Sequence, residues 1–170
     1  HYQPRRLEAE TIRDAILQLG GSLDRTMYGP SVLDDAPRRS IYLRVKRSEL
    51  LPIMTMFDAP EPTQSIGSRS ITTVPTQALT LMNSAFVRQQ AEKIAGEIRA
   101  QITGPPEDRV KAAFQRTLGR LPSETELTRM TEFVRQQQAA LPADTPNSEQ
   151  VAFTEFCHVL LCLNEFVYVD

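Results

Sequence analysis

The stretch SEQVAFTEFCHVLLCLN, residues 148–164, decides the fold class of the chain. Its large apolar side chains are spread over most sides of a helix and do not form a single stripe. A helix of this kind lies in the interior of a protein and is surrounded by other elements. The sequence therefore predicts a mainly α-helical bundle around a buried C-terminal helix.

Amphipathic helices that could surround this centre are predicted upstream of it. Four segments carry apolar side chains at three- and four-residue spacing, the period of one helix face. They are residues 5–19, 84–102, 107–118 and 123–140. Glycines follow three of them, and Ser123 with Glu126 opens the fourth in a capping-box pattern. Two shorter helices are predicted at 49–57 and 75–82.

One segment, Ser40–Arg47, has the alternation of a half-buried strand. Ile41, Leu43 and Val45 fall on one side, with polar residues between them. A strand needs a hydrogen-bonding partner, and the only other β-branched run nearby is residues 70–74. We therefore predict a small two-stranded element from about 40–47 and 70–74, preceded by a long loop over residues 20–40.

Composition and charge restrict the classes of function. The 170 residues, 41% of them hydrophobic, suit a single helical domain of residues 1–170. A net charge of −2 gives no general attraction to nucleic acid, and no apolar run approaches the roughly 18 residues that cross a membrane. We expect neither nucleic-acid binding nor membrane insertion. The chain opens on His1 without an initiator Met, which predicts a fragment of a larger protein.

The C-terminal helix contains both cysteines, Cys157 and Cys162. Helix geometry separates their Cα atoms by roughly 8–9 Å, which is beyond the reach of a disulfide. Two free, buried thiols are predicted.

The same helix contains the sharpest pattern for metal ligation. Glu155, His158, Cys162 and Glu165 are spaced so that one helix face would present a zinc-like ligand set. Against this, a single helix cannot close four ligands around one ion without strain. The alternative is a core histidine with its hydrogen bonds satisfied, and we predict no metal and no cofactor in this domain.

A basic segment is the first candidate binding surface. Five Arg and Lys side chains fall within residues 38–47, with no acidic residue among them. On a strand, Tyr42, Arg44 and Lys46 would project together as an aromatic and cationic face that suits phosphate, sulfate or a sugar acid. Arg69 completes this predicted set. The alternative is an edge strand protected by its charges.

A polar segment, residues 70–83, is the second candidate. Its hydroxyl and amide side chains could line a ligand pocket, and the candidates are Thr72, Thr73, Gln77 and Asn83. The alternative is structural, because such groups also cap helices and bond loop backbone.

Several strings, taken in order along the chain, resemble one known family. They are RRLEAE (5–10), GPSV (29–32), RSIYL (39–43), TTVPTQAL (72–79), LGR (118–120) and LNEF (163–166). Together they resemble the C-terminal planctomycete-specific domain of unknown function. They span nearly the whole chain.

The resemblance implies a setting and no established activity. In that family the domain typically ends large exported proteins that carry a signal peptide, a c-type cytochrome-like module and a second planctomycete-specific domain. This implies an extracytoplasmic location, periplasmic or secreted, and a place near the natural C-terminus. The haem attachment pattern Cys-x-x-Cys-His is absent from this chain, so any haem belongs to another part of the parent protein.

Familiar catalytic templates are missing, among them Gly-x-Ser-x-Gly, His-Glu-x-x-His, the P-loop and Gly-x-Gly-x-x-Gly. We therefore predict a noncatalytic interaction domain that docks on the other domains of an exported, cytochrome-associated protein or on a protein partner. The first alternative is a module that binds an anionic or sulfated polysaccharide through the basic set. The second is a hydrolase that uses loop carboxylates. The candidate carboxylates are Asp34, Asp35, Asp58 and Glu61.

Overall fold

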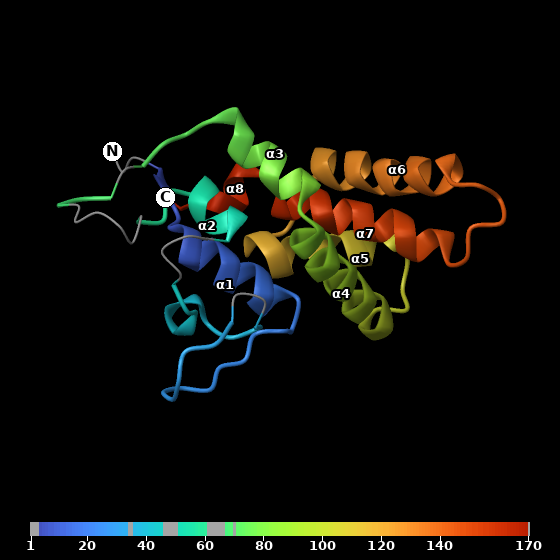
Figure 1. Ribbon diagram of the computed structural model, residues 1–170. Coiled ribbons are helices and arrows are strands. Elements are labelled where there is room, and N and C mark those ends of the chain that lie inside the picture. Colours follow the sequence, from blue (N-terminus) through green and yellow to red (C-terminus); the bar gives the residue numbers. More distant parts are fainter. Residues whose placement is uncertain (1–3, 34–35, 46–50, 61–66, 70, 170) are drawn as a thin grey trace.

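The computed structural model describes residues 4–33, 36–45, 51–60, 67–69 and 71–169. Its centre is helix α7 (Ser148–Leu161), which packs against α3 (Pro75–Asn83), α4 (Ala85–Gln101), α5 (Pro106–Leu118) and α6 (Glu124–Ala140). Figure 1 shows α7 running between α6 and α4. Phe156, Cys157, Leu160 and Leu161 are completely buried. The predicted mainly α-helical bundle around a buried C-terminal helix is confirmed.

The amphipathic helices begin and end where local signals predict. Ser84 caps α4, since its hydroxyl accepts a hydrogen bond from the Val87 amide. Gly119 ends α5 at a φ of 74°, in the left-handed region that favours glycine. Ser123 and Glu126 open α6 with the predicted capping box, in which each side chain accepts from the other residue's amide.

Helix α1 is shorter than the predicted segment 5–19. It spans Ala9–Leu19, and Arg5–Arg6 form strand β1 instead. This strand pairs antiparallel with β2 (Tyr168–Val169), so Arg6 lies opposite Tyr168. The two ends of the chain therefore meet at one end of the molecule (Figure 1). The short helices α2 (Pro52–Met56) and α8 (Asn164–Val167) also contribute buried residues to the core.

The predicted two-stranded element is present, but its location was wrong. Ser40–Tyr42 form a short 3-10 helix, η1, and residues 71–74 form no strand. Residues 46–50 and 70 lie outside the described residues. The alternation at residues 40–45 does not correspond to a strand. Leu43 packs against the core, but Ile41, which a strand would place on the same side, is 75% exposed. Only a single bridge links Leu43 to Val32.

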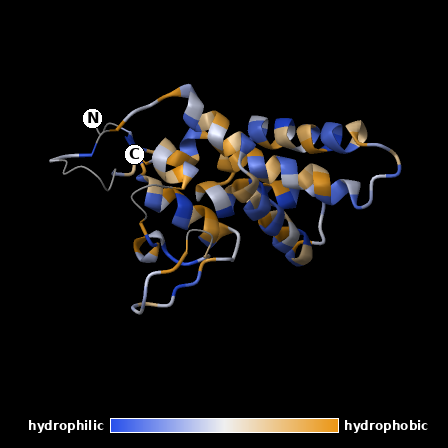
Figure 2. Cartoon of the chain, in the orientation of Figure 1, coloured by the Kyte–Doolittle hydropathy of each residue, from blue (hydrophilic) through white to orange (hydrophobic). Residues whose placement is uncertain are grey.

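Hydropathy follows this packing. Figure 2 shows hydrophobic and hydrophilic residues side by side along α4 and α6, as expected for helices with one face on the core. In the part of the chain that the structure describes, no helix is long and apolar enough to span a bilayer. Large exposed apolar side chains occur mainly outside the long helices.

Candidate functional site

The loop of residues 22–45, described except for 34–35, is held against α1 by Arg13. This side chain is buried, at 3% exposure. Its guanidinium donates to the carbonyls of Ala36 (2.7 Å) and Arg38 (2.9 Å) and to the Ser40 hydroxyl (3.3 Å). Next to it, the Asp14 carboxylate accepts from the Ser40 amide (2.8 Å) and hydroxyl (2.6 Å). Helix α1 therefore fixes the returning half of the 22–45 loop.

A second buried arginine, Arg38, holds the tip of the loop from inside. Its guanidinium donates to the carbonyls of Thr26 (3.1 Å), Tyr28 and Pro30 (3.0 Å). The same group lies 4.1 Å from the centroid of the Tyr42 ring, and the Tyr42 hydroxyl accepts from the Tyr28 amide at 3.0 Å. A guanidinium has five donors in a rigid fork, so it can cross-link backbone that has few hydrogen bonds of its own. The described part of the loop is thus a folded unit.

Although it is ordered, the 22–45 loop exposes large apolar side chains. Each of the following is more than half exposed: Met27, Tyr28, Leu33, Ile41 and Val45. A second exposed apolar group lies on α3 and just before it, at Ile71, Val74, Leu79 and Met82. Large apolar side chains that stay exposed on an ordered loop are candidates for contact with a partner.

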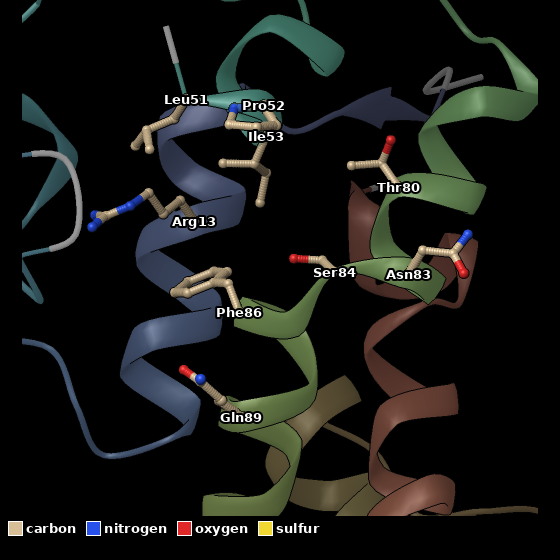
Figure 3. A pocket seen from close by; sticks show the side chains of 9 residues that line it. All are labelled: Arg13, Leu51, Pro52, Ile53, Thr80, Asn83, Ser84, Phe86 and Gln89. Atoms are coloured by element: carbon tan, nitrogen blue, oxygen red, sulfur yellow. The ribbon is translucent and has the colours of Figure 1, made fainter.

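A cavity of about 570 Å³ opens between α1, the start of α2 and the α3–α4 junction (Figure 3). Its lining combines apolar and polar side chains, namely Arg13, Leu51, Pro52, Ile53, Thr80, Asn83, Ser84, Phe86 and Gln89. Arg13 therefore borders the cavity as well as holding the loop, and its guanidinium lies 6.0 Å from the centroid of the Phe86 ring.

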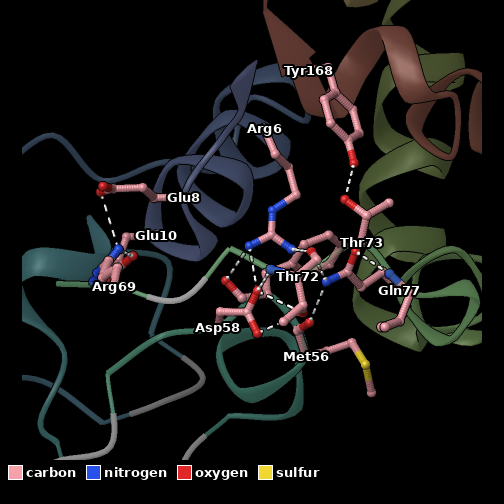
Figure 4. A network of polar contacts seen from close by, with 12 residues as sticks. Arg6, Glu8, Glu10, Met56, Asp58, Arg69, Thr72, Thr73, Gln77 and Tyr168 are labelled. Atoms are coloured by element: carbon pink, nitrogen blue, oxygen red, sulfur yellow. Dashed lines mark hydrogen bonds and ion pairs between the residues drawn. The ribbon is translucent and has the colours of Figure 1, made fainter. Parts of the chain in front are cut away.

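Asp58 connects β1 to the segment before α3 (Figure 4). Its carboxylate accepts from the guanidinium of Arg6 (2.8 Å) and from the amide (2.7 Å) and hydroxyl (2.9 Å) of Thr72. Arg6 is 5% exposed and also donates to the Thr72 carbonyl at 2.7 Å. Burial alone would raise the pKa of Asp58, but these hydrogen bonds outweigh it and lower the pKa. Asp58 is an ionised group that links β1 to the segment before α3.

The other predicted polar residues of 70–83 also have partners within the protein. The Gln77 amide donates to a carbonyl at the end of α2 (3.1 Å) and to the Thr72 carbonyl (3.0 Å). The Thr73 hydroxyl lies 2.9 Å from the Tyr168 hydroxyl in β2 (Figure 4). Asn83 lies at the end of α3 and borders the cavity. The predicted set therefore divides between a structural network and a cavity wall.

The strand that would have aligned Tyr42, Arg44 and Lys46 does not form over its described part. Tyr42 packs under Arg38, Arg44 is exposed, and Lys46 lies outside the described residues. Arg69 forms a bidentate pair with Glu10 at 2.5 and 2.9 Å and a further ion pair with Glu8 at 3.2 Å. The charge of Arg69 is thus compensated within the protein, and its hydrogen bonds lower the pKa of Glu10.

The predicted metal-ligand face is interrupted where α7 ends, at Leu161. Glu155 pairs with an arginine of α4, and Glu165, now in α8, pairs with the arginine that follows α5 at 2.5 Å. His158 is buried, and its Nε2 lies 3.0 Å from a carbonyl of α3. Among the described residues, no three His, Cys, Asp or Glu side chains gather where an ion could bind.

Both cysteines are free, as predicted, but they differ in burial. Cys157 is fully buried and Cys162 is half-buried. Burial raises the pKa of both thiols, that of Cys162 to about 11. Neither is a reactive thiolate at neutral pH.

Three of the four carboxylates considered for hydrolysis, Asp34, Asp35 and Glu61, lie outside the described residues. The fourth, Asp58, is engaged with Arg6 and Thr72. The carboxylate pair that hydrolysis requires is therefore untested by the structure.

Two residues that organise this region, Arg13 and Arg38, were not among the predicted site residues. The burial of Arg13 could have been recognised from the sequence, since Arg13 falls beside Ile12, Ile16 and Leu17 on the buried face of α1. A cation on an apolar face needs hydrogen-bond acceptors, which it finds in the loop. Arg38 has no comparable local signal, because it lies in the loop and not on the apolar face of a helix.

These features define a mainly α-helical domain with an ordered, partly apolar surface loop. The family model PSD1, described as "Protein of unknown function (DUF1553)", matches residues 1–134, and the chain belongs to this family. The matched part includes the 22–45 loop and all described residues that line the cavity. No curated protein and no solved structure gives a match. The family assigns a domain of unknown function and no activity.

Proposed function

We propose that this chain is a noncatalytic docking domain of an exported, cytochrome c-associated multidomain protein. The exported setting and the cytochrome rest on the resemblance to the planctomycete-specific domain. In this proposal the domain needs no cofactor of its own. The contact surface is the 22–45 loop, and one observation carries the proposal: Arg13 and Arg38 order the loop while five of its large apolar side chains stay more than half exposed.

An ordered loop is suited to binding because its conformational entropy is already lost before a partner arrives. Burying its apolar side chains contributes roughly 25 cal/mol per Å² of area removed from water. The backbone carbonyls of Thr26, Tyr28 and Pro30 already accept from Arg38, so covering the loop leaves them paired. Tyr28 and Ile41, at 77% and 75% exposure, are the two most exposed large apolar side chains among the described residues.

The test is association of this chain with the separately expressed remaining domains of the exported protein, measured by isothermal titration calorimetry. The Tyr28→Ser/Ile41→Ser double variant should bind at least about tenfold more weakly, because it removes two apolar anchors. Leu121→Ser is the matched control, since Leu121 is 63% exposed but lies between α5 and α6. An absence of binding by the unaltered chain, or an equal loss in Leu121→Ser, would contradict the proposal.

The two alternatives, a polysaccharide-binding module and a hydrolase, gain no specific support from the contacts of the described residues. For a polysaccharide site, Arg69 is already paired with Glu10 and Glu8. For a hydrolase, Asp58 is held by hydrogen bonds. Both stay predictions from the sequence.

A further inference from the structure

We propose that the cavity between α1, α2 and the α3–α4 junction binds an uncharged, mainly apolar small molecule that carries an amide, carbonyl or hydroxyl group at one end. The proposal does not depend on the docking function. At about 570 Å³, the cavity falls within the roughly 300–1,000 Å³ that is usual for small-molecule sites. Its lining decides the class of ligand.

The apolar wall of the cavity is preformed. Ile53 is 9% exposed and belongs to the core, and Leu51 and Pro52 lie beside it at the start of α2 (Figure 3). Phe86, in the first turn of α4, packs against the core and against Arg13. These side chains are positioned by contacts outside the cavity, so a ligand meets an existing apolar surface. This favours a ligand whose bulk is hydrocarbon.

The opposite wall is polar and uncharged, and its hydroxyls have partners within the helices. Ser84 caps α4, and the Thr80 hydroxyl donates to the Thr76 carbonyl at 2.9 Å. The Asn83 side chain uses its NH₂ for a carbonyl of α3, which leaves its Oδ1 as an acceptor. Gln89 adds an exposed amide on α4. Two amides therefore border the cavity at separate places (Figure 3), and either one can pair with an uncharged hydrogen-bonding group.

The charge state of the ligand follows from Arg13, the one charged side chain among the described residues of the lining. Its guanidinium already donates to the Ala36 and Arg38 carbonyls and the Ser40 hydroxyl, and it lies 3.7 Å from the Asp14 carboxylate. A carboxylate ligand would have to disrupt these bonds or lose its hydration without an equivalent partner. An ammonium ligand would meet a cation. Both ions are therefore disfavoured.

Nile red, an uncharged dye whose emission shifts with the polarity of its surroundings, is the probe. We expect saturable binding with a blue shift. Three competitors of equal chain length then test the ligand class: octanamide, octanoate and octylammonium. Octanamide should displace the dye at a concentration at least about tenfold lower than either ion, a difference of about 1.4 kcal/mol. Equal displacement by an ion would overturn the assignment of an uncharged ligand.

Variants locate the bound dye. Thr80→Phe should fill the cavity and weaken Nile red binding at least about tenfold. Thr128→Phe is the matched control. The Thr128 hydroxyl donates the same kind of hydrogen bond, 2.9 Å long, to the carbonyl four residues earlier, and Thr128 is exposed on α6. Thermal melts show that each variant is folded. Equal dye binding by the two variants would overturn the site, since it would place the dye on another surface.

A second pair of variants tests the amide wall. Gln89→Leu should reduce the preference for octanamide over octanoate, whereas Gln136→Leu, an exposed glutamine of α6, should leave the preference unchanged. An unchanged preference in Gln89→Leu together with Asn83→Ala would overturn the role of these amides.

Discussion

The guanidinium of Arg13, in α1, donates a hydrogen bond of 2.9 Å to the backbone carbonyl of Arg38, 25 residues further along the chain. Arg38 in turn donates to the carbonyls of Thr26 and Pro30. Two buried guanidinium groups thus fix the 22–45 loop to helix α1, although the loop has few backbone hydrogen bonds of its own. The exposed apolar side chains of the 22–45 loop owe their fixed positions to this arrangement.

Replacing Arg13 by methionine should destabilise the protein by about 2–4 kcal/mol, because the carbonyls of Ala36 and Arg38 and the Ser40 hydroxyl lose a buried donor. Urea unfolding measures the change. Arg135→Met is the control: Arg135 pairs with Glu132 on α6 and its side chain is 73% exposed. Arg135→Met should lower the free energy of unfolding by less than about 0.5 kcal/mol. Equal losses of stability in the two variants would contradict the structural role of Arg13.

Asp58→Ala should cost about 2–4 kcal/mol in the free energy of unfolding, since it leaves the buried guanidinium of Arg6 without its carboxylate. The Thr72 amide loses its acceptor as well. Removing a half-exposed carboxylate, as in Glu132→Ala on α6, should cost less than about 1 kcal/mol in the same unfolding assay. A cost for Asp58→Ala no larger than this would mean that the network of Figure 4 contributes little.

Acid should weaken the start of α6. The Arg120 side chain donates to Glu126 at 2.7 and 2.9 Å, and with the Ser123 amide it lowers the pKa of Glu126 from 4.5 to about 2. A lowered folded-state pKa means that the contribution to stability is complete above pH 4.5 and is lost as the pH falls towards about 2. The side chains of Arg120 and Glu126 are both more than a third exposed. Screening by solvent should therefore keep the contribution of this pair to stability below about 1 kcal/mol.

The check on this acid effect is the difference in Tm between the unaltered protein and Glu126→Gln, followed from neutral pH to about pH 3. The difference should shrink as the pH falls, and it should be smaller at high salt. A difference that stays constant with pH would contradict the assignment of the lowered pKa to this pair.

Phe156→Ala should destabilise the protein by about 3–5 kcal/mol, because Phe156 is fully buried at the centre of α7. Its ring lies 5.6 Å from that of Phe153 and 6.2 Å from that of Phe114, measured between centroids. Val159→Ala, on the same helix but 38% exposed, should cost less than about 1.5 kcal/mol in denaturant unfolding. Similar costs for the two variants would be incompatible with α7 as the buried centre.

The long helices could be predicted from the sequence because their signals are local. Ser84, Gly119 and the Ser123–Glu126 capping box lie within one turn of the ends that they define. The location of the two-stranded sheet could not be predicted, because β1 and β2 are two residues each and come from opposite ends of the chain. Strands this short show no alternation to detect.

The candidate site was only partly predictable for a related reason. Asn83, which borders the cavity, was in the predicted set, but Arg13 and Phe86 were not. Arg44 and Lys46 were grouped by the alternation of a strand that does not form over residues 40–45. The carbonyls that bind Arg13 and Arg38 carry no side-chain signature, so such long-range contacts become visible only in the folded chain.

Hydrogen exchange at the amides of Asp24, Val32 and Arg44 tests the ordering of the 22–45 loop most directly. These amides donate to the carbonyls of Pro37 (2.8 Å), Tyr42 (2.9 Å) and Val32 (2.8 Å), respectively. We predict exchange at least about 100-fold slower than in an unstructured chain, and at least about tenfold faster in Arg13→Met, with the α7 amides protected in both proteins. Exchange of the three amides at the rate of an unstructured chain, in the unaltered protein, would contradict the account.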